Sequence, residues 1–384
     1  MPLTALLAAA LLLPQQRAED FSEAWKQAET AIRGRYYDRL DQKDRMDALL
    51  AKYAPIASAT KGRNEFRDVV VRMIDEFGDS HFDFLTESDQ GFYTLGELAP
   101  GGSPKKMPHI GAWFATDPAG YRVQMVLEGM ASEKAGLRPG DVIESVDGQP
   151  FSPVDSLKPL IGKDAAFRVR HDGEWKTVTM RVEESEGMAM FVKASRNSRR
   201  IIEHEGKRYG YFHLWAMAKE EFKNALSAYV YGPGMRTDGF ILDIRDGFGG
   251  RPEGYADPFF RPEVKLEWIV GEASIPQFFG YQKPLVLLVN DGSRSAKEVL
   301  AYILKKSKRA TLVGEPTGGR VLGTSPLRFG DWAILEIPMI DLLVDDIRLE
   351  GNGVEPDFLV TERYGAQGND LYIERALEVL KMAR

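Results

Sequence analysis

Residues 284–319 read PLVLLVNDGSRSAKEVLAYILKKSKRATLVGEPTGG. The apolar run Leu285–Val289 predicts a buried strand, which the turn-forming residues 290–292 bring to an end. Apolar residues then recur at helical spacing and predict a helix, namely Ala296, Val299, Leu300 and Ile303. Residues 310–313 predict a second buried strand. This strand–helix–strand unit indicates an α/β fold with parallel strands and a right-handed crossover.

Two serines, Ser293 and Ser295, lie at the turn from strand to helix. This is the carboxyl end of a strand, where open α/β sheets bind their ligands. The free N–H groups at the start of the helix could also hold a developing oxyanion. Serine is a preferred N-cap residue as well, so this stretch alone leaves a purely structural cap as the alternative.

The composition limits which classes of function are possible for this chain. The chain has 384 residues, enough for two or three domains, and 43% of them are hydrophobic, which supports a sizeable core. A net charge of −7 without a basic stripe argues against a nucleic-acid partner. The absence of cysteine excludes disulfides, thiolate zinc sites and a cysteine nucleophile. No nucleotide, zinc or calcium motif appears, so we expect neither a cofactor nor a metal.

The first residues favour export. Leu3–Leu13 is an apolar run of the length of a signal-peptide core, too short to span a bilayer. We therefore expect a signal peptide over 1–18, cleaved after Ala18, and a secreted or periplasmic protein without a stable membrane span after its removal. A buried or uncleaved anchor helix is the alternative.

Residues 19–90 predict a helical N-terminal domain, and residues 91–106 a linker. The third predicted helix ends at Gly78, a typical C-cap. Ser80 and His81 follow directly, on a loop at the helix end. A single histidine in such a place is by itself explained as a surface or capping residue.

Residues 107–185 predict short strands separated by turns. The stretch EGMASEKAGLRPGDVIESVDGQPF, residues 128–151, resembles a PDZ domain. In such a domain a loop and strand receive the C-terminal carboxylate of a peptide and pair with its backbone. We assign this substrate-binding role to Gly111, Ala112, Trp113 and Phe114. A small β-rich insert without a ligand is the alternative.

Residues 186–384 return to an α/β pattern. The buried strand predicted at Gly239–Ile244 runs into a glycine-rich loop that contains Gly249 and Gly250. Glycines at a strand end allow the backbone to approach a ligand closely. We expect Asp243 and Arg245 to stabilise this loop rather than to act in chemistry.

Four stretches now occur in order: FILDIRDGFGG, PLVLLVNDGSRSAKEVLAYIL, RATLVGEPTGG and LEGNGVEPD. Together with the PDZ-like segment they resemble the serine peptidase family of carboxyl-terminal-processing (tail-specific) proteases and the tricorn protease. The resemblance implies an α/β and α+β multidomain protein with a ClpP/crotonase-like protease core. It also implies that Ser295 is the nucleophile, with Ser293 as the lesser candidate.

The family activates its serine in two ways, and the residues favour the second. In one branch the base is a lysine, but Arg320 stands at that position, and a guanidinium cannot act as a base. Lys297 is two residues beyond Ser295, where helical side chains do not face each other. The tricorn branch instead implies His81 as general base, Ser80 as the residue that orients it and Glu350 as support.

The resemblance further implies an oxyanion hole formed by the N–H of Ala296 and that of Gly249 or Gly250. We therefore predict a serine endopeptidase that acts on polypeptides, held by their C-terminal tails at the PDZ-like domain. Self-association into a homo-oligomer stays open. The alternatives are an inactive peptidase that has lost its lysine and a non-catalytic peptide-binding scaffold.

Overall fold

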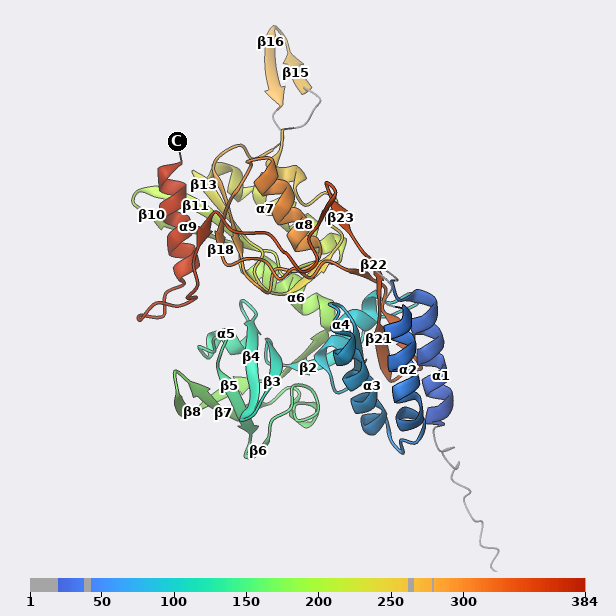
Figure 1. Ribbon diagram of the computed structural model, residues 1–384. Coiled ribbons are helices and arrows are strands. Elements are labelled where there is room, and N and C mark those ends of the chain that lie inside the picture. Colours follow the sequence, from blue (N-terminus) through green and yellow to red (C-terminus); the bar gives the residue numbers. More distant parts are fainter. Residues whose placement is uncertain (1–19, 38–42, 262–265, 278–279, 384) are drawn as a thin grey trace, which may run out of the picture.

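The computed structural model describes residues 20–37, 43–261, 266–277 and 280–383. The predicted signal peptide therefore lies outside the described residues. Figure 1 shows a helical bundle, a small β domain and an α/β core, with one hairpin that stands away from the core. The bundle contains α1 (Phe21–Arg35), α2 (Lys43–Ser58) and α3 (Arg63–Phe77). In the described part of the chain, no helix is long and apolar enough to cross a membrane.

The buried residues of the bundle confirm the helical periodicity predicted from the sequence. Asp20 caps α1 by accepting the N–H of Ser22 at 3.0 Å, and the buried residues of α1 step at helical spacing. Helix α3 ends at Gly78, which has φ +71° and donates its N–H to the Ile74 carbonyl. This left-handed C-cap turns the chain sharply, and Phe82 after the turn still packs in the core of the bundle.

The segment predicted as a linker, 91–106, is different in the structure. Most of its first half lies in helix α4 (Gln90–Leu98), which follows the short strand β1 (Asp83–Thr86). Phe92 and Tyr93 of this helix are buried in the main hydrophobic core. The Gly, Ser and Pro residues that suggested a linker are concentrated at 100–104, after the helix has ended.

The PDZ-like domain is a sheet in the order β3-β4-β5-β7-β8, with β6 paired to β5. Strand β3 is therefore an edge strand. The bounds are β3 (Ala112–Asp117), β4 (Gly120–Val126), β5 (Val142–Val146), β6 (Gln149–Pro150), β7 (Asp164–His171), β8 (Glu174–Arg181) and the short helix α5 (Ala131–Lys134). The antiparallel pair β2 (Lys106–His109) and β9 (Glu183–Glu186) closes the domain at both chain ends.

The core sheet has the strand order β10-β11-β13-β17-β18-β25. All its neighbouring pairs are parallel except β10 with β11. The strands are β10 (Arg200–His204), β11 (Lys207–His213), β13 (Gly239–Asp243), β17 (Leu285–Val289), β18 (Thr311–Gly314) and β25 (Phe358–Leu359). Strands β17 and β18 with the helix between them confirm the unit predicted from residues 284–319.

Helices cover both faces of this sheet. Strand residues alternate between two cores: Leu287 packs with helices α6, α7 and α8, whereas Val286 and Leu288 pack with α9 on the opposite face. The helices are α6 (Gly187–Asn197), α7 (Glu220–Tyr231), α8 (Ala296–Lys306) and α9 (Leu371–Met382). The carboxyl ends of the parallel strands are thereby left free to build a site.

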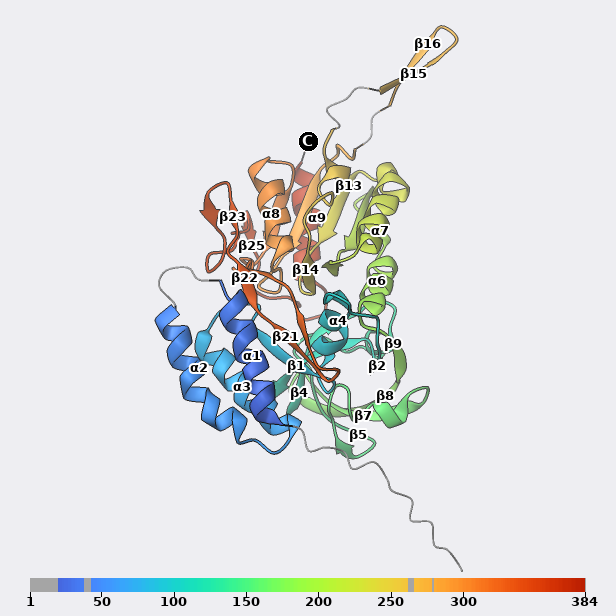
Figure 2. The same cartoon turned by 90° about the vertical axis from the view of Figure 1, so that its right-hand side faces the viewer.

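Short strands connect the parts. The chain after β18 returns to the helical bundle, where β20 and β21 form a sheet with β1 (Figure 2). These strands are β20 (Leu327–Phe329) and β21 (Ala333–Glu336). The remaining pairs are β12 (Ala216–Met217) with β14 (Phe248–Gly250), β15 (Leu266–Val270) with β16 (Ala273–Gln277), β19 (Gly323–Thr324) with β22 (Pro338–Ile340), and β23 (Leu343–Val344) with β24 (Ile347–Arg348). Single 3₁₀ turns occupy Lys158–Leu160, Pro233–Arg236 and Asp257–Phe259.

Candidate active site

Ser295 lies at the turn between β17 and α8, at the carboxyl end of the core sheet. Its backbone has φ +60° and ψ −131°, a conformation that costs a residue other than glycine on the order of 1–3 kcal/mol. The N–H of Ser295 donates to the Arg320 carbonyl at 2.7 Å, which helps to hold this conformation. An ordinary N-cap has an extended backbone, so capping alone does not account for this geometry.

Ser293 has a structural role instead. Its side chain is fully buried, accepts the N–H of Asn290 at 3.1 Å and donates to the Ile244 carbonyl at 3.0 Å. These bonds fix the turn that follows β17 against the end of β13. Ser293 is thus the lesser candidate on geometry as well as on sequence.

Glu298 fixes the nucleophile turn and was not singled out from the sequence. Its buried carboxylate accepts the N–H of Ser295 at 3.2 Å and the hydroxyl of Thr317 at 2.6 Å. It also accepts the N–H groups of Gly319 and Arg320, both at 2.8 Å. A glutamate three residues after a serine is the sequence signature of a capping box, which could have found it.

The glycine-rich loop approaches Ser295 closely. A β-carbon placed on Gly249 would lie 2.4 Å from the Cβ and 2.6 Å from the Oγ of Ser295, so only glycine fits there. Gly250, with φ +139°, packs against the Met217 carbonyl instead. The backbone nitrogen of Ala296, at the start of α8, would lie 3.1 Å from the same β-carbon placed on Gly249.

His81 and Ser80 form a pair on the loop after α3. The Oγ of Ser80 lies 3.0 Å from Nδ1 of His81. Burial lowers the pKa of His81 to about 3, and the nearby positive charges of Arg294 and Arg320 add to this shift. The imidazole is therefore neutral at neutral pH and can accept a proton. His81 and Ser295 both line the same cleft.

Glu350 contacts the backbone of residues 321 and 322. Its carboxylate accepts the N–H of Val321 and that of Leu322, the latter at 3.1 Å. Among the residues that the structure describes, no hydrogen bond joins Glu350 to Ser80 or to His81. Glu350 instead supports the chain directly after Arg320, whose carbonyl holds the N–H of Ser295.

The cleft has a volume of about 1250 Å³ and is bounded by all three parts of the molecule. Charged side chains line it as well as His81 and Ser295, among them Asp83, Arg294 and Glu336. Burial raises the pKa of Asp83 to about 6 and that of Glu336 to about 7. Within the described ranges, no group of three or more histidine and acidic side chains is arranged to hold a metal ion.

The predicted peptide-binding strand is only partly open. Trp113 and Phe114 line the cleft, but Gly111 is packed against Met130 and its carbonyl accepts the hydroxyl of Ser132 at 2.7 Å. The side-chain amide of Gln90, from α4, occupies the free edge of the strand. It donates to the Ala112 carbonyl at 3.0 Å and accepts the Phe114 N–H at 3.2 Å. These are groups that an added peptide strand would use.

Neither of the two cations near the motif serves as a base in this arrangement. Arg320 forms an ion pair with Asp291 at 2.9 Å. Lys297 is fully buried and donates to the carbonyl of Asp246 in the glycine-rich loop. Burial lowers the pKa of Lys297 to about 7, but in the described structure the charged group of neither residue is hydrogen-bonded to the Ser295 side chain.

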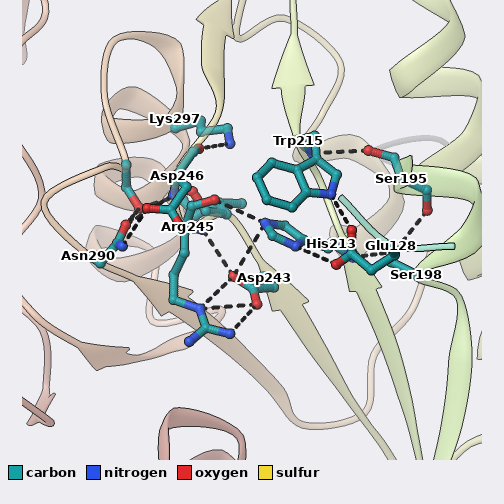
Figure 3. Close-up of polar contacts among 12 residues, drawn as sticks. Glu128, Ser195, Ser198, His213, Trp215, Asp243, Arg245, Asp246, Asn290 and Lys297 are labelled. Carbon is teal, nitrogen blue, oxygen red and sulfur yellow. Dashed lines mark hydrogen bonds and ion pairs between the residues drawn. The ribbon is translucent and has the colours of Figure 1, made fainter. Parts of the chain in front are cut away.

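Asp243 and Arg245 stabilise the glycine-rich loop, as expected. They form a buried ion pair at 2.6 Å, and Arg245 also pairs with Asp370 at 2.9 Å. Figure 3 shows a second set of contacts beside them, in which Glu128 reaches His213 and Trp215. The sequence analysis singled out none of these three side chains for a role, and their contacts join positions more than 80 residues apart.

Three family models match the chain. Residues 208–360 match peptidase family S41, residues 122–170 match the PDZ domain, and residues 13–75 match the tricorn protease C1 domain. A tricorn protease homolog of Saccharolobus solfataricus is 25% identical over 334 residues, which cover 82% of this chain and 30% of that protein. A carboxyl-terminal-processing protease of Synechocystis sp. is 30% identical over 224 residues, covering 54% of this chain and 51% of that protein. The chain thus spans about a third to a half of these curated relatives.

Solved structures agree on the fold. The crystal structure of the tricorn protease aligns with a TM-score of 0.56 at 18% identity, over 94% of this chain and 36% of that one. The photosystem II D1 C-terminal processing protease aligns with a TM-score of 0.55 at 22% identity, over 91% of this chain and 96% of that one. The resemblance predicted from the sequence is therefore confirmed: the chain matches peptidase family S41 over residues 208–360, together with a PDZ domain and a tricorn C1 domain, and it shares the fold of these solved proteases.

Proposed function

We propose that this protein is a serine endopeptidase in which Ser295 is the nucleophile and His81 the general base. The observation that carries the proposal is the position of both residues on one cleft, with Ser295 in a constrained turn beside Gly249. Ser80 orients the imidazole, and Glu350 supports the segment that holds the backbone of Ser295. The apolar run at 3–13 supports export of the chain to a secreted or periplasmic location.

The chemistry follows from the hydrogen bonds. If Nδ1–H of His81 donates to Ser80 Oγ, Nε2 is unprotonated and accepts the proton of Ser295. The Oγ–carbon bond then forms, and the tetrahedral oxyanion is held by N–H groups of Gly249 and Ala296. His81 returns the proton to the leaving amine as the carbon–nitrogen bond breaks. Water then hydrolyses the acyl-enzyme by the same route.

We propose in addition that substrates reach the cleft by way of the PDZ domain. A C-terminal tail would pair with the edge of β3 and displace the amide of Gln90. Because Trp113 and Phe114 line the cleft that contains Ser295, a peptide on this strand would lie next to the reacting groups. This arrangement supports the cleavage of polypeptides near their C-termini.

The test is hydrolysis of an unfolded protein substrate by the chain without residues 1–18. We expect Ser295→Ala and His81→Ala each to lower kcat/KM by roughly 1,000-fold or more, since both act in one step. Ser307→Ala, at the opposite end of α8, is the matched control and should keep full activity. Circular dichroism would show that each variant is folded.

Two results would contradict the proposal. Activity that survives His81→Ala but not Ser295→Ala would mean that another group is the base. A folded wild-type chain that hydrolyses no substrate in a broad peptide library would favour the non-catalytic scaffold.

A further inference from the structure

One carboxylate of the PDZ domain reaches into the peptidase core. Glu128 follows strand β4, and its Oε1 lies 2.8 Å from Nδ1 of His213, at the end of β11. Its Oε2 accepts the indole N–H of Trp215 (Figure 3). The side chain of His213 is 3% exposed and that of Glu128 is 15% exposed, so water screens this contact little.

The two core partners of Glu128 are the residues that hold the glycine-rich loop. Nε2 of His213 donates to the Arg245 carbonyl at 3.0 Å. The carbonyl of Trp215 accepts the N–H of Phe248 at 2.8 Å. The loop that carries Gly249 is therefore fixed at Arg245 and at Phe248 by two residues that share one carboxylate.

The geometry of this contact gives each buried polar group a partner. Nδ1 of His213 faces one carboxylate oxygen of Glu128, Nε2 faces the Arg245 carbonyl with the Asp243 carboxylate 3.9 Å away, and the indole N–H of Trp215 faces the second oxygen of Glu128. Replacing one oxygen of Glu128 by a group that cannot accept would leave a buried group of His213 or Trp215 without its hydrogen-bond partner, which is costly.

Small movements of this loop reach the nucleophile directly. Gly249 is in contact with Ser295, with no room for a methyl group between them. Phe248 also packs edge-on against Trp113 of the PDZ strand β3, with ring centroids 5.3 Å apart. A shift of the loop therefore changes where the Gly249 N–H points relative to Ser295.

We propose that Glu128 is a positioning residue of the active site, which sets the loop of residues 245–250 through His213 and Trp215. The inference rests on the proposed function, because it assigns the loop its role at the oxyanion. Glu128 is not among the described residues that line the cleft, so its effect is indirect. It makes the PDZ domain a structural part of the catalytic centre in addition to a place for substrate tails.

The test compares Glu128→Gln with the wild type on a peptide too short to reach the PDZ strand. Glutamine keeps the shape of the side chain but offers one acceptor and no charge. We expect kcat to fall about 10- to 100-fold with KM changed by less than about threefold, since misplacement of a catalytic group by 1 Å costs on the order of 100-fold. Glu174→Gln, an exposed carboxylate of the same domain, is the matched control.

A second measurement does not depend on activity. Amide hydrogen exchange in peptides that span 245–250 should be faster in Glu128→Gln than in the wild type, and unchanged in Glu174→Gln. Wild-type kcat in Glu128→Gln, a change in KM alone, or unaltered exchange would each overturn the inference. Failure of the proposed function shows separately, as lack of hydrolysis by the wild type, and the exchange result still decides on Glu128.

Discussion

At the scale of single residues, the cleft holds more acid and base groups than the proposed reaction uses. Asp83 and Glu336 lie directly opposite each other on the paired strands β1 and β21. Burial keeps a proton on Glu336 up to a pH of about 7, and the neighbouring charge of Asp83 acts in the same direction. The positive charge of Arg294 opposes both effects but is the weaker influence. These carboxyl groups titrate in the physiological range, whereas His81 does not.

We predict that the contribution of Glu336 to stability falls as pH rises through the range in which Glu336 loses its proton. The pKa of Glu336 is about 7 in the folded protein against a reference of 4.5, so the folded state binds the proton more tightly than the unfolded state. The contribution of this group to the free energy of unfolding should therefore drop by about 3 kcal/mol between pH 4.5 and pH 8, while the lowered pKa of His81 acts in the opposite direction. The difference between the wild type and Glu336→Gln in urea denaturation across this range measures the drop.

Glu336→Gln should remove the part of the pH dependence that comes from this group, because glutamine does not titrate, and should leave the part that comes from Asp83, whose pKa is also raised. Glu174→Gln should leave it as in the wild type. An equally steep dependence in Glu336→Gln would assign the titration to other groups.

At the scale of elements, the most informative contact is between helix α4 and strand β3. Edge strands expose unpaired backbone groups, and proteins cover or occupy them. Here the Gln90 amide satisfies one carbonyl and one N–H of β3 at once. Gln90 is 5% exposed, and the same helix contributes Leu95 and Leu98 to the cleft. A peptide that adds to β3 has to compete with this side chain.

We predict that Gln90→Ala binds C-terminal peptides more tightly than the wild type. The variant leaves the Ala112 carbonyl and the Phe114 N–H unoccupied, so the peptide no longer displaces two hydrogen bonds. Each is worth about 0.5–1.5 kcal/mol, which together corresponds to roughly a tenfold or greater fall in Kd. Isothermal titration with a peptide that has a free α-carboxylate measures this.

The same peptide with an amidated C-terminus tests for recognition of the carboxylate. Gln149→Ala, on the exposed strand β6 of the PDZ domain, is the control variant and should bind as the wild type does. Equal affinity in Gln90→Ala and the wild type would show that peptides do not use this edge of β3.

At the scale of the whole molecule, a late segment of the chain packs against the N-terminal helical bundle. The hydrophobic core of the N-terminal helices includes Phe329, Trp332 and Leu335, which come more than 250 residues after the last helix of the bundle ends at Phe77. Phe66 lies at the centre of this core, fully buried, with ring contacts to residues from both ends of the chain. The loop that carries His81 leaves the bundle from the same helix.

We predict that Phe66→Ala destabilises the protein by about 3–5 kcal/mol, the usual cost of removing a fully buried phenylalanine. Urea denaturation followed by tryptophan fluorescence measures this change. Ile56→Ala, at a position that is 46% exposed in the same bundle, should cost far less. A loss below about 1 kcal/mol for Phe66→Ala would show that the bundle does not form one cooperative core with the returning strands.

The sequence predicted those structural features that depend on residues close together along the chain, namely strands, helices and caps. Periodicity and turn residues located β17, α8 and β18 correctly, because side-chain burial in a strand or helix repeats every two or about 3.6 residues. The PDZ strands and the cap at Gly78 follow from the same local rules. The motifs around Ser295 and the glycine-rich loop also led to the family. Helix α4 was missed because its glycines and the adjoining Gly-Ser-Pro stretch obscured its apolar positions.

Only the tertiary structure decided which distant groups meet. The resemblance implied that Glu350 supports Ser80 or the imidazolium, which stays a prediction, and the structure shows that its carboxylate binds the backbone of Val321 and Leu322. No sequence pattern predicted the contact of the Gln90 amide with β3 or that of the Glu128 carboxylate with His213. Such contacts depend on how the domains pack and on the need of each buried polar group for a partner, and neither is periodic along the chain.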